Sequence, residues 1–180
     1  MYEGTASYNE EYVLMTPPRT GGRYLFTILQ PYGFLGGGGG EPKRMSHSRI
    51  VPDHAKDFHR ILAVRNPFTR LVSFYQLIQN HWQPDHEYNK ETFEEFVDFV
   101  VGRNDILEPL THYIDDGTYI FIHFETFEDD FYSLDFTNNE EINLLRSITD
   151  WESYYNNETK EKVRAYYAED FKKFGYATDF

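Results

Sequence analysis

The strongest constraint on the fold of this 180-residue chain is a repeated pattern, in which a short apolar run stops abruptly and a helical segment follows. Residues 11–16 (EYVLMT) form one such run and end at two prolines, and residues 60–65 (RILAVR) form another that ends at Asn66-Pro67. The length of both runs favours buried strands. Because strands that alternate with helices pair in parallel under a cover of helices, the pattern predicts an α/β fold.

The segments after these two runs have the apolar spacing of helices. Residues 23–30 (RYLFTILQ) predict a helix that lasts until Pro31, and residues 68–79 (FTRLVSFYQLIQ) predict a second with Pro67 in its first turn. A capping-box pattern of Thr92 and Glu95 marks the start of a third helix, over residues 93–101. The other predicted elements are a strand in residues 118–125 and helices over residues 139–148 and 157–174, the last ending at Gly175.

The organisation of the chain predicts a single domain over residues 1–180, because the length suits one sizeable core and no internal repeat occurs. Residues 33–46 interrupt the pattern and contain five consecutive glycines, Gly36 to Gly40. No regular element tolerates such a run, so this segment is expected to be a loop, either a connector or a lid.

Composition excludes several classes of function. With no cysteine, the chain cannot form disulfides, thiolate zinc sites, iron–sulfur clusters or a cysteine nucleophile. A net charge of −13 argues against binding a nucleic-acid polymer, whereas an 18% aromatic content argues against a disordered acidic tail. The sequence shows no signal peptide and no apolar run long enough to span a bilayer, so the expected location is cytoplasmic, without a membrane partner.

The charge is unevenly distributed along the chain. Residues 1–18 carry a net charge of −3, residues 19–75 carry +6 and residues 76–180 carry −16. A basic segment inside an acidic protein predicts a small anionic ligand, although ordinary scatter of charges is the alternative interpretation.

The first candidate site is the segment 16–24 (TPPRTGGRY), which joins a predicted strand to a predicted helix. Glycine allows a ligand to approach the backbone, and a helix N-terminus offers unpaired N–H groups and partial positive charge. Together with Arg19, Thr20 and Arg23, Gly21 and Gly22 would cradle a phosphate. The segment is not a Walker A loop, and a tight turn with exposed arginines is the alternative.

A second motif, R-N-P…S-x-Y from Arg65 to Tyr75, also places an arginine at a strand end, with Ser73 in the helix that follows. The two motifs together resemble those of sulfotransferases that use 3′-phosphoadenosine 5′-phosphosulfate (PAPS). The resemblance implies a three-layer P-loop NTPase-like sulfotransferase fold with a mainly parallel sheet flanked by helices. It also implies that residues 20–24 bind the 5′-phosphosulfate and that Arg65 and Ser73 bind the 3′-phosphate.

Particular positions refine the resemblance. Arg19 stands where many family members have lysine, and Tyr24 stands where cytosolic members have a tryptophan that stacks on adenine. Gly22 and Arg23 replace hydroxyl residues, and the Arg-Lys-Gly segment of the cytosolic branch is missing. Residues 121–131 and 169–176 are similar to the strand end and the C-terminus of the family, the latter in its carbohydrate-type branch.

For the catalytic base the candidate is His47, since cytosolic family members carry a histidine base between the same two motifs. A histidine is suited to proton abstraction near neutral pH. Carbohydrate-type members use a glutamate, for which Glu41 is the alternative. Arg19 would stabilise the leaving phosphate, and the chemistry implies no metal.

The sequence therefore predicts transfer of a sulfuryl group from PAPS to a hydroxyl or amine, with a small-molecule or carbohydrate acceptor. Two alternatives stay open. One is another nucleotide-dependent transferase such as a small-molecule kinase, although the loop lacks a Walker lysine. The other is a non-catalytic module that keeps only the nucleotide site.

Overall fold

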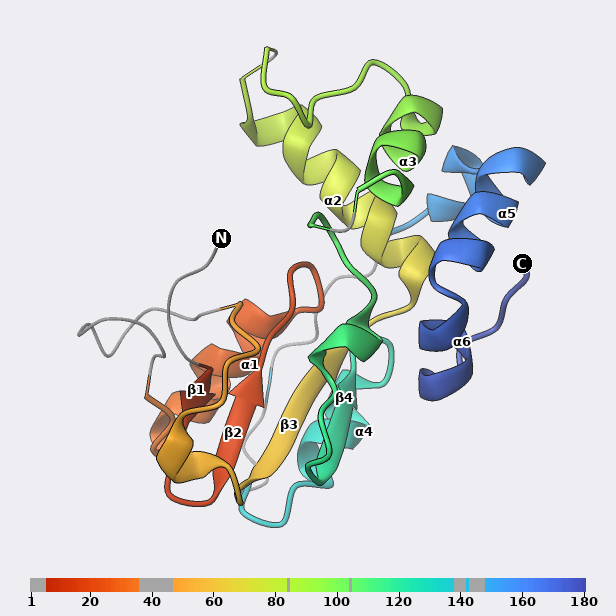
Figure 1. Ribbon diagram of the computed structural model, residues 1–180. Helices are drawn as coiled ribbons and strands as arrows, with labels where there is room; N and C mark the ends of the chain where they lie inside the picture. Colours follow the sequence, from red (N-terminus) through yellow and green to blue (C-terminus); the bar gives the residue numbers. More distant parts are fainter. Residues whose placement is uncertain (1–5, 36–46, 84, 104, 138–141, 143–147) are drawn as a thin grey trace. The chain divides into compact units, whose positions relative to one another are not determined.

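The structure of the chain is a computed structural model that describes residues 6–35, 47–83, 85–103, 105–137, 142 and 148–180 (Figure 1). The chain divides into two compact units. The first unit comprises Met1–Arg65 and Tyr113–Arg146, and the second comprises Asn66–His112 and Ser147–Phe180. A single domain over residues 1–180 stays a prediction.

The first unit contains a four-stranded mixed sheet with the order β1-β2-β3-β4. β2, β3 and β4 run parallel, whereas β1 pairs antiparallel with β2. The strands are β1 Ser7–Tyr8, β2 Tyr12–Met15, β3 His59–Val64 and β4 Tyr119–His123. The three strands expected from the apolar runs are confirmed, as is the mainly parallel sheet. β1 was not expected, because two residues are too few to show a periodicity.

Two helices of the first unit, α1 (Gly22–Leu29) and α4 (Phe127–Tyr132), pack on one face of this sheet (Figure 1). The shared core includes Leu14, Ile61 and Ile122 from the strands and Phe26 and Phe127 from the helices. The helix expected after the two glycines is confirmed. Its end passes into the 3₁₀ turn η1 (Gln30–Tyr32), which holds Pro31, and a second 3₁₀ turn, η2, spans Asp53–Ala55.

The second unit is helical and has its own core. Its α-helices are α2 Pro67–His81, α3 Phe93–Val101, α5 Asn157–Tyr166 and α6 Ala168–Phe174. The 3₁₀ turn η4 (Trp151–Tyr154) also belongs to it, and η3 (Leu110–Tyr113) lies at the end of its first segment. Its core includes Phe68, Leu71, Phe96, Val163 and Phe171.

The starts of α2 and α3 follow from local chemistry, as expected. The Asn66 side chain accepts a hydrogen bond from the Phe68 N–H, and Pro67 fills the first helical position, where no N–H is needed. At α3, Thr92 and Glu95 form both hydrogen bonds of a capping box. These helix boundaries were therefore predictable from a few neighbouring residues.

The expectation of one continuous helix over residues 157–174 was wrong, because α5 and α6 are separated at Tyr167. Its φ and ψ of −105° and 23° leave the helical region. The Tyr167 hydroxyl is buried and donates to the Leu107 carbonyl at 2.7 Å. The buried Asp170 carboxylate accepts from the N–H groups of Leu110 and Thr111 at 2.7 and 2.9 Å. Such distant partners leave no mark on the helical periodicity. The helix expected over residues 139–148 lies almost entirely outside the described residues.

Candidate functional site

The loop between β2 and α1, residues 16–21, folds back on itself through a strained backbone. Arg19 has a φ of 68° and Gly21 a φ of 80°, both in the left-handed region. The buried Thr20 hydroxyl donates to the Pro17 carbonyl at 2.8 Å. A left-handed arginine costs about 1–2 kcal/mol, a strain that proteins tend to keep at functional sites.

Gly22, the first residue of α1, allows the helix to begin directly against the end of β2. A Cβ atom at Gly22 would lie 2.4 Å from the Thr16 Cβ and 2.9 Å from its Cγ2. Glycine is therefore required by close approach of helix and strand. The space that a side chain would need here is filled by Thr16, so Gly22 serves the packing of α1 against β2.

The electrostatics of the loop suit an anion. α1 has no side-chain cap and no acidic residue in its first turn, so nothing on the helix itself neutralises the positive end of its dipole. Arg19 is half-buried, and its pKa is lowered first by burial and then by repulsion from Arg23. Arg19 nevertheless keeps its charge at neutral pH. A bound anion would relieve the repulsion between the two guanidinium groups.

Arg65 connects the end of β3 to this loop. It is 4% exposed, and its Nη1 donates to the Arg19 carbonyl at 3.2 Å. Its guanidinium carbon lies 3.8 Å from the centroid of the Phe124 ring, which follows β4. Because the carboxyl ends of parallel strands meet at one edge of the sheet, residues after β2, β3 and β4 come together here.

His47 also reaches the loop. Its Nδ1 lies 2.5 Å from the Thr16 carbonyl oxygen. A carbonyl can only accept a hydrogen bond, so Nδ1 must carry the proton. In the neutral ring the lone pair is then on Nε2, the atom that a general base needs. The Tyr113 hydroxyl donates to the His47 carbonyl at 3.4 Å and holds the backbone as well.

The structure thus brings together Arg19, Thr20, Gly21, Gly22, His47 and Arg65 within the first unit. Arg23 is exposed on α1, and Tyr24 is half-buried, with its ring centroid 5.6 Å from that of Phe127. Ser73 lies on α2 of the second unit and is 3% exposed. Glu41 and the glycines 36–40 lie outside the described residues.

The residues that contact His47 and Arg65 were not predicted from the sequence. The Thr16 carbonyl could not be anticipated, since any residue supplies one. Phe124 had a weak signal, because it forms the aromatic–glutamate pair at the end of the predicted strand. His123, the last residue of β4, also has a partner that no local pattern marks. Its backbone N–H and its Nδ1 both contact the Asp130 carboxylate, at 2.6 and 2.8 Å, so this pair connects β4 to α4.

The described ranges contain neither a cluster of metal-ligating side chains nor a membrane-spanning helix. No group of three or more histidine, aspartate or glutamate side chains among those residues could hold a metal ion. None of the helices there is both long and apolar enough to cross a membrane.

A family model described as "Sulfotransferase family" matches residues 40–129, which is half of the chain. The match includes His47, Arg65 and Ser73 and begins after the loop that carries Arg19. No curated protein and no solved structure matched the chain.

Proposed function

Because the chain belongs to the sulfotransferase family, we propose that it transfers a sulfuryl group from PAPS to a hydroxyl or amine acceptor. The observation that carries the proposal is the contact between His47 and the loop of Arg19. This contact places a ring able to accept a proton beside a loop suited to an oxyanion. When bound, PAPS would supply the activated sulfuryl group.

The residues of the first unit fit the donor's 5′ end. The phosphosulfate oxygens would accept from the uncapped N–H groups at the start of α1, at Gly21 and Gly22, and Arg19 and Arg23 supply positive charge. The planar guanidinium group of Arg19 can donate two parallel N–H hydrogen bonds, a geometry that matches the oxygens of an oxyanion. In this proposal Thr20 contributes to the same cradle, and Tyr24 offers its ring to the adenine.

In this proposal Arg65 binds the 3′-phosphate, whereas the role of Ser73, which belongs to the second unit, stays a prediction from the sequence. The hydrogen bond from Arg65 to the Arg19 carbonyl supports a link between the two phosphate motifs. Through this contact the residue that binds one phosphate also fixes the loop that binds the other. Arg65 is buried, so little freedom is lost when it takes a ligand.

The proposed chemical step uses two residues. His47 Nε2 accepts the proton of the acceptor as its oxygen or nitrogen forms a bond to sulfur. The bond from sulfur to the bridging oxygen breaks, and Arg19 stabilises the charge that develops on the departing phosphate. By analogy with phosphoryl transfer, positioning and electrostatics supply most of the rate enhancement.

Two competing functions make different demands. A kinase would need a Walker lysine and carboxylates for Mg²⁺, and the loop holds arginines and no carboxylate. A module that only binds nucleotide would not need a ring oriented by the Thr16 carbonyl. The acceptor is proposed to be a small molecule or a carbohydrate, and the cytoplasmic location stays a prediction.

A binding experiment separates the nucleotide classes. We expect 3′,5′-ADP, the product of PAPS, to stabilise the protein in a thermal-shift assay, by about 2.7 kcal/mol at 100 times its Kd. ATP with Mg²⁺ should give a much smaller shift. Stabilisation by ATP–Mg²⁺ alone would overturn the proposal.

A matched pair of variants then tests catalysis. His47→Asn keeps an N–H that can reach the Thr16 carbonyl but has no basic nitrogen, whereas His47→Ala removes both. Transfer of labelled sulfate to an acceptor panel should fall by about 100-fold or more in both variants, with 3′,5′-ADP affinity retained in His47→Asn. Near-normal turnover in His47→Asn would exclude His47 as the base.

A further inference from the structure

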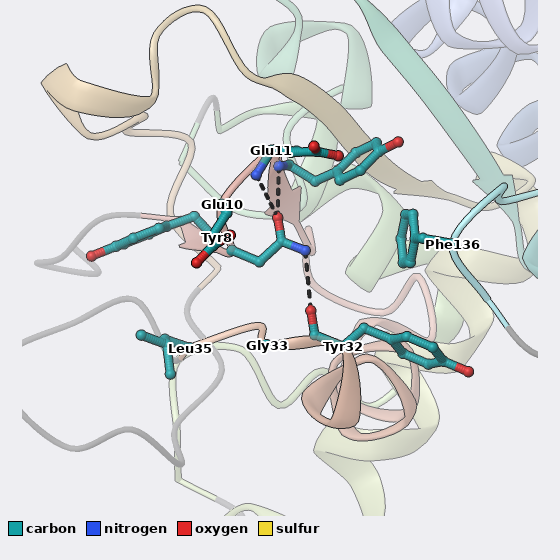
Figure 2. Close-up of a pocket in the computed structure, with 9 residues that line it drawn as sticks. Tyr8, Glu10, Glu11, Tyr32, Gly33, Leu35 and Phe136 are labelled. Atoms are coloured by element: carbon teal, nitrogen blue, oxygen red, sulfur yellow. Dashed lines mark hydrogen bonds between the residues drawn. The ribbon is translucent and has the colours of Figure 1, made fainter.

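A pocket of about 480 Å³ lies in the first unit, beside the start of β2 (Figure 2). The loop of Arg19 follows the other end of this strand. Its walls come from the turn that precedes β2, from the end of η1 and from the segment after α4. The lining residues are Tyr8, Asn9, Glu10, Glu11, Tyr12, Tyr32, Gly33, Leu35 and Phe136. The length of β2, about 10 Å at 3.3 Å per residue, separates the pocket from the loop.

Aromatic rings form much of the wall. Phe136 lies at the centre of the ring contacts, with its centroid 4.7 Å from that of Tyr12 and 5.7 Å from that of Tyr32. Tyr8 packs edge-on against His54 at 4.9 Å, and Leu35 is 51% exposed at the mouth. Contiguous ring surface beside an exposed leucine provides a place for an apolar ligand group.

Two carboxylates complete the pocket. Glu10 and Glu11 are exposed at the turn, and within the described ranges no ion pair or hydrogen bond is made by either side chain. The turn is held instead by Asn9, whose Oδ1 accepts from the N–H groups of Glu11 and Tyr12 at 2.9 and 2.7 Å. The Asn9 Nδ2 donates to the Tyr32 carbonyl at 3.1 Å (Figure 2).

The charge of Glu11 acts on the side chain of Tyr12. The pKa of Tyr12 is raised by burial, then by its hydrogen bond to Asp135, and also by the nearby charge of Glu11. Negative charge beside aromatic faces attracts cations, because the ring quadrupole and the carboxylates favour the same sign of ligand. An anion would be repelled, and a neutral ligand would leave the carboxylates unpaired.

We propose that this pocket binds a small organic cation, an ammonium group carried on an apolar or aromatic body. The ammonium would pair with Glu10 and Glu11, and the body would lie against Phe136 and the tyrosines. The volume suits a small molecule. The pocket is a second site, apart from that of sulfuryl transfer, and its existence does not depend on the proposed function.

The probe for the test is benzylammonium, with benzyl alcohol as a neutral analogue of the same shape. In ¹H–¹⁵N spectra of the full chain, benzylammonium up to about 10 mM should shift the amides of Glu11, Tyr12 and Gly33 with saturation. The amides of Gly21 and Gly22 should not move. Benzyl alcohol should bind at least about tenfold more weakly.

Two double variants complete the design. Glu10→Gln/Glu11→Gln removes the charge without touching any described side-chain contact, and should weaken benzylammonium binding at least about tenfold. Glu128→Gln/Asp129→Asn removes the same charge from exposed positions on α4 and should leave the affinity within about twofold.

Three outcomes would overturn the proposal. These are absence of saturable shifts, equal binding of benzyl alcohol to the unmodified protein, and equal affinity in the Glu10→Gln/Glu11→Gln variant. The comparison of the two probes needs no variant, so it stays decisive even if a variant folds poorly. Binding of 3′,5′-ADP to the same sample reports separately on the proposed function.

Discussion

Replacing Gly22 by alanine tests whether close approach of α1 to β2 builds the anion site. The new Cβ would lie 2.4 Å from the Thr16 Cβ and 3.2 Å from its Cα. These atoms are fixed to the backbone of a fully buried residue, so no side-chain rotation can relieve the clash. Either the helix or the end of the strand must move.

The expected cost follows from overpacking. Inserting a methyl group into a well-packed region costs about 1–3 kcal/mol, and contact with backbone atoms favours the upper half of this range. A loss of about 2 kcal/mol corresponds to a fall of about 4–8 °C in the melting temperature for a protein of this size. Because Thr16 also supplies the carbonyl that orients His47, the change should disturb the base as well as the loop.

Urea denaturation and calorimetry with 3′,5′-ADP measure the two effects separately. Gly22→Ala should lower the unfolding free energy by about 2 kcal/mol and weaken 3′,5′-ADP binding by about tenfold or more. Gly175→Ala is the control, because Gly175 has a φ of 72° in the second unit and no described atom lies within 4 Å of the position that its new Cβ would take. It should cost about 1 kcal/mol through strain alone and leave the binding unchanged.

The reasoning would be refuted if Gly22→Ala kept both its stability, within about 0.5 kcal/mol, and its affinity for 3′,5′-ADP. Equal loss of affinity in Gly175→Ala would also refute it, since the effect would then follow general destabilisation. Loss of stability with full affinity would show that the close approach serves the fold alone.

Three further predictions concern single side chains. Arg65→Lys should weaken 3′,5′-ADP binding about tenfold by calorimetry, because an ammonium cannot reproduce the guanidinium fork that contacts the Arg19 carbonyl; unchanged affinity would contradict this. Asp170→Ala should lower the unfolding free energy in urea by about 3 kcal/mol, since three hydrogen bonds end on this buried carboxylate; a loss below about 1 kcal/mol would contradict it. Burial alone would raise the pKa of Asp115, but hydrogen bonds, first that from the Gly117 N–H, lower it below its ordinary value of 3.8. Its ionised form therefore stabilises the fold above about pH 4, and this stabilisation is lost as the pH falls further. In Asp115→Asn the unfolding free energy should therefore decrease less steeply with falling pH in the acid range. An unchanged dependence on pH would contradict this prediction.

The sequence by itself determined the elements whose causes are local. Prolines follow the ends of β2 and β3, Asn66 caps α2, and Thr92 with Glu95 caps α3, all within a few residues of the boundary they set. Alternation of strands and helices then fixes a mainly parallel sheet. The loop of Arg19 was predictable for the same reason, since Gly21 and Gly22 mark it directly.

Only the tertiary structure decided which groups meet. His47 contacts the Thr16 carbonyl 31 positions away, and Arg65 contacts the Arg19 carbonyl 46 positions away. The break at Tyr167 depends likewise on a carbonyl 60 positions away. In each case the acceptor is a backbone carbonyl, which every residue possesses and no sequence pattern marks. Local propensity fixes where an element begins and ends, but the pairing of distant polar groups depends on how the elements pack.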